Sequence, residues 1–222
     1  KTMVKVQGTP ILSHIVDAYN AVGIKDIVVV RGYKKETVNL PNLTYVDNDD
    51  FVDTGELESL LKALQSRTGR LQNTIISYGD VLFNKFIPQS LCQETDDCVI
   101  FIDSDWQAQP GYIRLGGFAE CTIPNSRKAF NAKIYLKRLG DTIPQTSIHG
   151  VSMGFLKISP SAATFITGIL VELMASPANH KATMSLLLQE LLKRNYPIRV
   201  LYTVGHWLDI NSIEDVVQAG NF

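Results

Sequence analysis

Short apolar segments alternate with amphipathic helical segments along the first half of this chain, and this alternation restricts the fold more than any other feature. Residues 26–30, 74–77 and 98–102 are largely apolar runs of strand length, a pattern typical of strands buried on both faces of a parallel sheet. Residues 10–22 and 56–64 repeat apolar side chains at helical spacing. Because strands and helices joined by short links form right-handed βαβ units, the sequence predicts an α/β protein. We expect an open, mostly parallel sheet with helices on both faces.

The middle of the chain has a different character. Residues 111–137 are rich in β-forming residues and turn signals but lack helical periodicity, which indicates an inserted β-rich segment of antiparallel strands. Further patterns predict strands at 43–46, 151–158 and 198–204, and helices at 160–174, 182–194 and 212–219. Ser212 is the expected N-cap of the last helix. With no repeat, low-complexity tract or linker, residues 1–222 are predicted to form a single domain.

Charge and cysteine content exclude several classes of protein. The formal net charge is −1, so the chain lacks the basic surface of a nucleic-acid-binding protein, and any bound nucleotide should be small. Three cysteines without a CxxC pair make a disulfide framework improbable and favour a reduced, cytoplasmic setting. The longest apolar runs are too short to span a bilayer, so no membrane partner is expected.

The residues that directly follow the apolar runs are the candidates for ligand binding, because ligands of open α/β sheets bind beyond the carboxyl ends of the strands. These residues are RGY at 31–33, DNDD at 47–50, YGD at 78–80, DSD at 103–105 and DIN at 209–211. Several of these segments carry carboxylates that should meet at one edge of the sheet. Hard oxygen ligands of this kind suit Mg²⁺, which completes its coordination with substrate phosphates and water.

A simpler explanation is that Asp and Asn cap helices and fill turns after strands, and for any single Asp it is the stronger one. Asp80 is the exception, because it follows Gly79 and has distant candidate partners in Asp209 and Asn211. We therefore predict a Mg²⁺ site with ligands from Asp80, Asp209 and Asn211. The sequence leaves open which of the last two residues binds the metal.

Several spaced motifs resemble those of one superfamily. They are VQGTPIL at 6–12, GIKDIVVVRGY at 23–33, YGDVLF at 78–83 and WLDINSIED at 207–215. Together they are similar to the nucleotidyltransferases that join a nucleotide to a sugar phosphate, choline phosphate or phosphonate. The resemblance covers nearly the whole chain and implies the Rossmann-like fold of the nucleotide-diphospho-sugar transferases. In that superfamily a Gly-rich loop cradles the triphosphate; it is not in these 222 residues, and we expect it to precede Lys1.

Other sequence motifs favour one branch of the superfamily. TGELESL at 54–60, DSDW at 103–106 and the segment 149–155 resemble cytidylyltransferase domains that are fused to phosphoenolpyruvate mutase. That resemblance implies Mg²⁺-dependent transfer of CMP from CTP to 2-aminoethylphosphonate or 2-hydroxyethylphosphonate, with release of pyrophosphate. It also implies a fused or partner mutase. Two alternatives remain: a choline-phosphate or sugar-phosphate nucleotidyltransferase, and a catalytically silent nucleotide-binding or assembly domain.

The resemblance also suggests roles for individual residues. The expected catalytic residues are Lys1, Asp80 and Lys133; the nucleotide-binding residues Ser59, Tyr78 and Gly79; and the residues that bind the acceptor Asp103, Trp106 and Gly154. The simpler alternatives are Lys1 as a flexible terminus, Lys133 and Lys137 as solvated strand charges, and Ser59 as part of an ordinary helix start. Trp207 is expected in the core. The leucines of residues 184–192 belong to the core or to a homodimer face.

Overall fold

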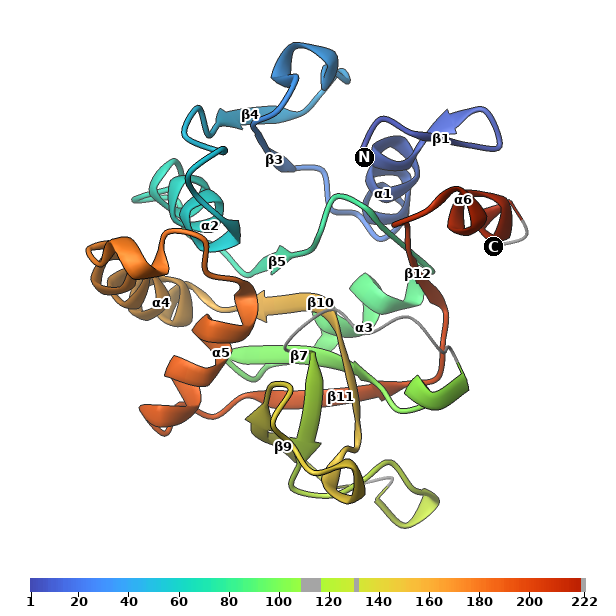
Figure 1. Cartoon of the computed structure of the whole chain (residues 1–222), viewed down its shortest axis with the longest axis vertical. Helices are drawn as coiled ribbons and strands as arrows, with labels where there is room; N and C mark the ends of the chain where they lie inside the picture. Colours follow the sequence, from blue (N-terminus) through green and yellow to red (C-terminus); the bar gives the residue numbers. More distant parts are fainter. Residues whose placement is uncertain (109–116, 130–131, 221–222) are drawn as a thin grey trace.

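The computed structural model describes residues 1–108, 117–129 and 132–220 (Figure 1). The α-helices are α1 (Ile11–Ala21), α2 (Glu56–Gln65), α3 (Phe86–Gln93), α4 (Pro160–Met174), α5 (Met184–Lys193) and α6 (Ile213–Ala219). The strands are β1 (Lys5–Val6), β2 (Thr9–Pro10), β3 (Val28–Arg31), β4 (Thr44–Asp47), β5 (Thr74–Ile76), β6 (Val81–Phe83), β7 (Cys98–Asp103), β8 (Phe118–Cys121), β9 (Ile134–Leu139), β10 (Gly150–Ile158), β11 (Arg199–Thr203) and β12 (Trp207–Asp209). Short 3-10 helices lie at Lys35–Thr37, Trp106–Ala108, Arg127–Ala129, Gln145–Ser147 and Pro177–Asn179.

The main sheet has the strand order β5-β10-β7-β11-β9-β8, and β10 also pairs with β8. Strands β7 and β11 are parallel, as are β3 and β4, which form a separate pair. The predicted α/β class is confirmed, but more neighbouring strands are antiparallel than expected. The reason is β10, which lies antiparallel between β5 and β7 and so separates two strands that run in the same direction.

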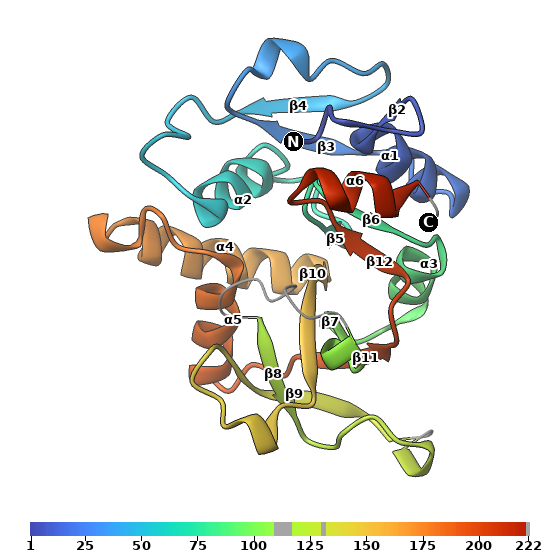
Figure 2. The same ribbon diagram turned by 45° about the vertical axis from the view of Figure 1, so that its right-hand side comes forward.

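Alternate residues of β7 pack into two separate hydrophobic clusters on opposite faces of the sheet, as side chains of a strand must. Ile100 and Ile102 face the leucine-rich helices α2 and α5 together with α4, whereas Val99 and Phe101 face α1, α3, β6 and β12. Figure 2 shows these two layers on either side of the sheet. Helices on both faces are thus confirmed.

Several predicted ends are observed within one or two residues. Helix α1 begins directly after Pro10, and Gly23 beyond its C-terminus has a φ of 87°. Ser212 caps α6 in a capping box with Asp215, which confirms the predicted N-cap. In α5, Leu187, Leu188 and Leu191 are buried in the core, as one of the two alternatives predicted; the homodimer stays a prediction. Helix α3 was not predicted from the sequence.

The short antiparallel pair β6–β12 positions the candidate site. Trp207 pairs with Phe83 and Asp209 with Val81, so the residues before β6 lie beside those after β12. Both views place the start of the chain close to α6, which follows β12 (Figures 1 and 2). Within the described residues, no helix is long and apolar enough to cross a membrane.

Candidate functional site

Three side chains from distant parts of the chain meet at the carboxyl edge of β5. The backbone N–H of Ile210 donates a hydrogen bond to the carbonyl of Asp80 at 3.0 Å, which fixes the two segments side by side. The Lys1 ammonium then lies 3.3 Å from Asp80 Oδ2 and 2.6 Å from Asn211 Oδ1. The structure therefore brings Lys1 together with Asp80 and Asn211, the two residues that the sequence placed at the same edge.

Neighbouring backbone contacts hold these three residues in position. The Thr2 hydroxyl donates to the Gly79 carbonyl at 3.0 Å, so the segment that carries Lys1 is attached to the segment that carries Asp80. On the other side, the Asp215 carboxylate accepts hydrogen bonds from the backbone N–H groups of Asn211 and Ser212, at 2.8 and 2.7 Å. The capping box of α6 thereby fixes the backbone of Asn211.

The oxygen atoms around the Lys1 ammonium form a donor set that fits a cation. Asp80 contributes a carboxylate oxygen and Asn211 an amide oxygen, and the positive group between them shows that both oxygens converge on one point. Mg²⁺ binds through one or two protein carboxylates and takes its remaining ligands from phosphates and water. Among the described residues, no three His, Cys, Asp or Glu side chains gather as a metal site, so a bound metal would depend on the substrate for ligands. Asp209 is 1% exposed in β12, and its metal role stays a prediction.

Tyr78 links this edge to a small cavity. Its hydroxyl donates to Glu56 Oε2 at 2.8 Å, and the same oxygen accepts the backbone N–H of Met184 at 2.8 Å. The Tyr78 ring packs directly on Gly154, which has a φ of 79°; a Cβ there would lie 2.1 Å from Tyr78 Cδ2. Gly154 is thus required for the ring position, and both residues line the cavity. Glu56 was predicted only as part of a helix start, and its place in the cavity was not expected from the sequence.

Ser59 takes part in hydrogen bonds that stabilise the start of α2. Buried Asn48 donates from Nδ2 to Thr54 Oγ1 at 3.0 Å and to Ser59 Oγ at 3.1 Å. The side-chain oxygen of Asn48, Oδ1, is buried and has no hydrogen-bond partner among the described residues. The simpler alternative for Ser59, an ordinary helix start, accounts for these contacts, and its nucleotide-binding role stays a prediction.

Asp103 has a structural role. Its carboxylate is 2% exposed and accepts hydrogen bonds from Trp207 Nε1 at 2.7 Å, Asp105 N at 2.9 Å and Gly205 N at 3.3 Å. These donors fix the ends of β7 and β11 relative to β12, and a contact of Asp103 with the acceptor stays a prediction. Trp207 is buried in the core, as expected. The half-buried Trp106 ring packs edge-on against Phe118, and its substrate role stays a prediction.

Lys133 lies at the end of the sheet opposite to Asp80. Its ammonium pairs with Asp96, 3.0 and 3.2 Å from the two carboxylate oxygens, and this ion pair raises the pKa of Lys133. Asp96 precedes β7, whereas Asp80 follows β5, which runs parallel to β7; the ion pair is therefore at the opposite end of the sheet. This ion pair matches the simpler alternative of a solvated strand charge, and the catalytic role of Lys133 stays a prediction. Lys137 pairs instead with Glu120 at 2.9 Å, as a solvated strand charge would.

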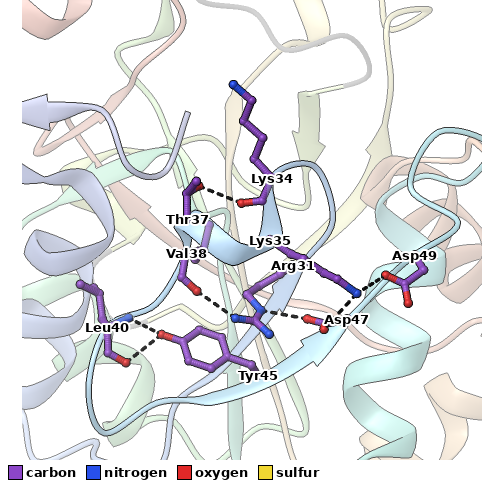
Figure 3. A network of polar contacts seen from close by, with 9 residues as sticks. All are labelled: Arg31, Lys34, Lys35, Thr37, Val38, Leu40, Tyr45, Asp47 and Asp49. Atoms are coloured by element: carbon purple, nitrogen blue, oxygen red, sulfur yellow. Dashed lines mark hydrogen bonds and ion pairs between the residues drawn. The ribbon is translucent and has the colours of Figure 1, made fainter.

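The carboxyl ends of β3 and β4 are held by a network of ion pairs (Figure 3). Arg31 Nε donates to Asp47 Oδ1 at 2.8 Å, and Lys35 lies 3.4 Å from the other oxygen of Asp47 and 2.5 Å from Asp49. The hydrogen bond from Arg31 is the main cause of a lowered pKa of Asp47. The Arg31 guanidinium also lies 4.2 Å from the centre of the Tyr45 ring. These charges are paired with one another, which gives them a structural role.

Comparison with known proteins agrees with this architecture. The CTP:phosphocholine cytidylyltransferase of Streptococcus pneumoniae superimposes with a TM-score of 0.70 at 16% identity, over 99% of this chain and 88% of that one. The inositol-1-phosphate CTP transferase of T. maritima gives 0.72 at 13% identity, over 100% and 86%. UDP-glucose pyrophosphorylase in complex with UDP-glucose gives 0.74 at 15%, over 100% and 89%. At these identities the likeness demonstrates a shared fold.

Sequence comparison identifies the family. A search of curated proteins finds no match. The sequence profile of the MobA-like NTP transferase domain matches residues 1–133, which is more than half of the 222 residues. The chain therefore belongs to the MobA-like NTP transferase family and is a nucleotidyltransferase.

Proposed function

We propose that this enzyme transfers CMP from CTP to a small phosphonate, 2-aminoethylphosphonate or 2-hydroxyethylphosphonate, and releases pyrophosphate. The observation that carries the proposal is the convergence of Lys1, Asp80 and Asn211 on one point at the carboxyl edge of the sheet. The similarity of residues 54–60, 103–106 and 149–155 to phosphonate cytidylyltransferase domains supports the acceptor. Two of the similar structures act with CTP, which supports the nucleotide.

The reaction demands little covalent chemistry from the protein. A phosphonate oxygen attacks the α-phosphorus of CTP, the bond to the β-phosphate oxygen breaks, and pyrophosphate leaves. The enzyme must align the two anions and stabilise the charge on the phosphoryl oxygens. A Lys1 ammonium at this edge can neutralise a phosphate or phosphonate oxygen.

Asp80 and Asn211 are the residues that we propose hold Mg²⁺, with Asp209 as a further candidate ligand. Bound there, Mg²⁺ supplies Lewis-acid stabilisation of phosphoryl oxygens. Asp80 contributes the negative charge, and Asn211 contributes a neutral oxygen that binds more weakly. One protein charge makes the affinity for free metal low, so nucleotide and metal should bind together.

A sugar-phosphate nucleotidyltransferase is the second candidate. The similarity to UDP-glucose pyrophosphorylase has a TM-score of 0.74, against 0.70 for the phosphocholine enzyme, so the fold does not favour one nucleobase.

Pyrophosphate release tests the proposal. The purified enzyme, in its natural length, is incubated with Mg²⁺, each of the four NTPs, and in turn 2-aminoethylphosphonate, 2-hydroxyethylphosphonate, phosphocholine and glucose 1-phosphate. Release with CTP and a phosphonate is expected. Release only with phosphocholine or glucose 1-phosphate would favour the other transferases, and no release with any pair would favour the catalytically silent domain.

A further inference from the structure

We infer that Glu56 is a specificity-determining residue that recognises a primary ammonium group on the acceptor, so that the enzyme prefers 2-aminoethylphosphonate to 2-hydroxyethylphosphonate. The inference rests on the proposed function and extends it to the choice of acceptor. It starts from the cavity of about 50 Å³ beside Tyr78.

The cavity lies at the same edge of the sheet as Asp80. Tyr78 precedes Asp80 by two residues, and Ser152 pairs with Ile102 near the carboxyl end of β7. Helices α2 and α5 close the cavity from one side, through Glu56 and Met184. An acceptor bound at the Lys1–Asp80–Asn211 site would thus lie at the same edge of the sheet as the cavity.

The electrostatics of the cavity favour a cation. Glu56 carries the one charge among the described lining residues, and no described Lys, Arg or His forms an ion pair with it. Its oxygen Oε2 is occupied by the Tyr78 hydroxyl and the Met184 N–H, whereas no described group donates to Oε1. A carboxylate without a counter-ion beside a substrate site attracts a positive group and repels a phosphate, so the anionic end of the acceptor should stay at Lys1.

The remaining lining distinguishes a primary ammonium from a quaternary one. Ser152, Thr183 and Ser185 also line the cavity, and their hydroxyl groups together with Glu56 supply several hydrogen-bond acceptors in this lining. A primary ammonium has three N–H donors to match them, whereas a trimethylammonium has none. Quaternary ammonium groups are bound in cages of several aromatic rings, and Tyr78 is the one aromatic residue among the described lining residues.

The test compares acceptors with and without the amine in two variants. Glu56→Gln keeps an oxygen that can accept both the Tyr78 hydroxyl and the Met184 N–H but removes the charge. Glu58→Gln is the matched control, since Glu58 is on the same helix, pairs with Lys62 at 3.7 Å and does not line the cavity. Steady-state pyrophosphate release gives kcat/KM for 2-aminoethylphosphonate, 2-hydroxyethylphosphonate and O-phosphoethanolamine, and melting temperatures confirm that both variants fold.

We expect the kcat/KM of the wild type to be about tenfold or more higher for 2-aminoethylphosphonate than for 2-hydroxyethylphosphonate. Glu56→Gln should abolish this preference by raising the KM for 2-aminoethylphosphonate. Glu58→Gln should retain the preference. A wild type without the preference, or a Glu56→Gln variant that keeps it, overturns the inference. Turnover of O-phosphoethanolamine alone would refute the phosphonate acceptor, yet its loss in Glu56→Gln would still support amine recognition. Failure to use any amine-bearing acceptor overturns the inference, even if hydroxyethylphosphonate is a substrate.

Discussion

The Lys1 ammonium donates a 2.6 Å hydrogen bond to the side-chain oxygen of Asn211, so residues 210 positions apart in the sequence complete one site. Asp80 joins them at 3.3 Å from the same nitrogen. The antiparallel pair β6–β12 makes this possible, because it places Asp80, just before β6, beside Asn211, just after β12.

Asp80→Ala should remove turnover without unfolding the protein. The carboxylate is partly exposed, with 19% of its side-chain area accessible, and its ion pair with Lys1 at the surface contributes little to stability. Loss of the charge that we propose holds the metal should lower kcat by about 100-fold or more, while the melting temperature stays within a few degrees. Pyrophosphate release and calorimetry on the same sample measure both. A large drop in melting temperature would show instead that Asp80 is structural.

Lys1→Met should strengthen metal binding in the absence of nucleotide. The ammonium sits between the two oxygens that we assign to the metal, so it competes with a cation for them. Removing it should lower the Kd of Mn²⁺, used as a probe for Mg²⁺, by roughly fivefold, while turnover falls because a phosphate-neutralising charge is lost. Electron paramagnetic resonance of free Mn²⁺ gives the affinity. The exposed Lys5→Met serves as control. Equal or weaker Mn²⁺ binding in Lys1→Met would argue against a shared cation position.

Gly154→Ala should displace the Tyr78 ring. The positive φ of Gly154 disfavours any side chain, and the new Cβ would overlap the ring at 2.1 Å. We expect a loss of about 2 kcal/mol in the free energy of unfolding and a raised KM for the acceptor. Gly168→Ala in α4 is the control, since nothing lies within 4 Å of its added Cβ; it should stabilise the protein by about 0.5–1 kcal/mol. Unaltered stability in Gly154→Ala would contradict the described packing of Tyr78.

The three cysteines should differ in reactivity. Burial raises the pKa of Cys98 to about 12 and that of Cys121 to about 11, so at pH 8 almost none of either thiol is ionised. Cys92 is exposed. Iodoacetamide at pH 8 should therefore alkylate Cys92 in the folded protein, and Cys98 and Cys121 only after unfolding, with mass spectrometry of peptides as the measurement. Rapid alkylation of Cys98 under native conditions would refute its burial.

Local sequence patterns predicted five of the six described α-helices, because helix periodicity, Pro10 before α1 and the Ser212 capping box act within a few residues. The carboxylate at Asp80 was also predictable, since it follows an apolar strand and a glycine. These signals are sufficient for the α/β class but do not determine the strand order. The position of β10 between β5 and β7 depends on pairing over about 80 and 50 residues, which no local pattern encodes.

Three residues whose contacts differ from those expected, or that were not expected at a site, have partners far away in the sequence. Asp103 is fixed by the indole of Trp207, 104 residues away, and Glu56 accepts the N–H of Met184, 128 residues away. Lys133 pairs with Asp96, across 37 residues. A strand alternation rule gives the face of a side chain but not the partner that it meets, so these roles required the tertiary structure.

The most direct test of the central claim is ³¹P NMR of the reaction of CTP, Mg²⁺ and 2-aminoethylphosphonate with the enzyme. The account predicts that the phosphonate signal is replaced by coupled signals of a P–O–P linkage between CMP and the phosphonate, with an equal amount of pyrophosphate. Under the same conditions, Asp80→Ala should leave the starting signals unchanged. If the wild-type enzyme gives no new phosphonate signal, and CMP is transferred to another acceptor or to none, the result would contradict the account.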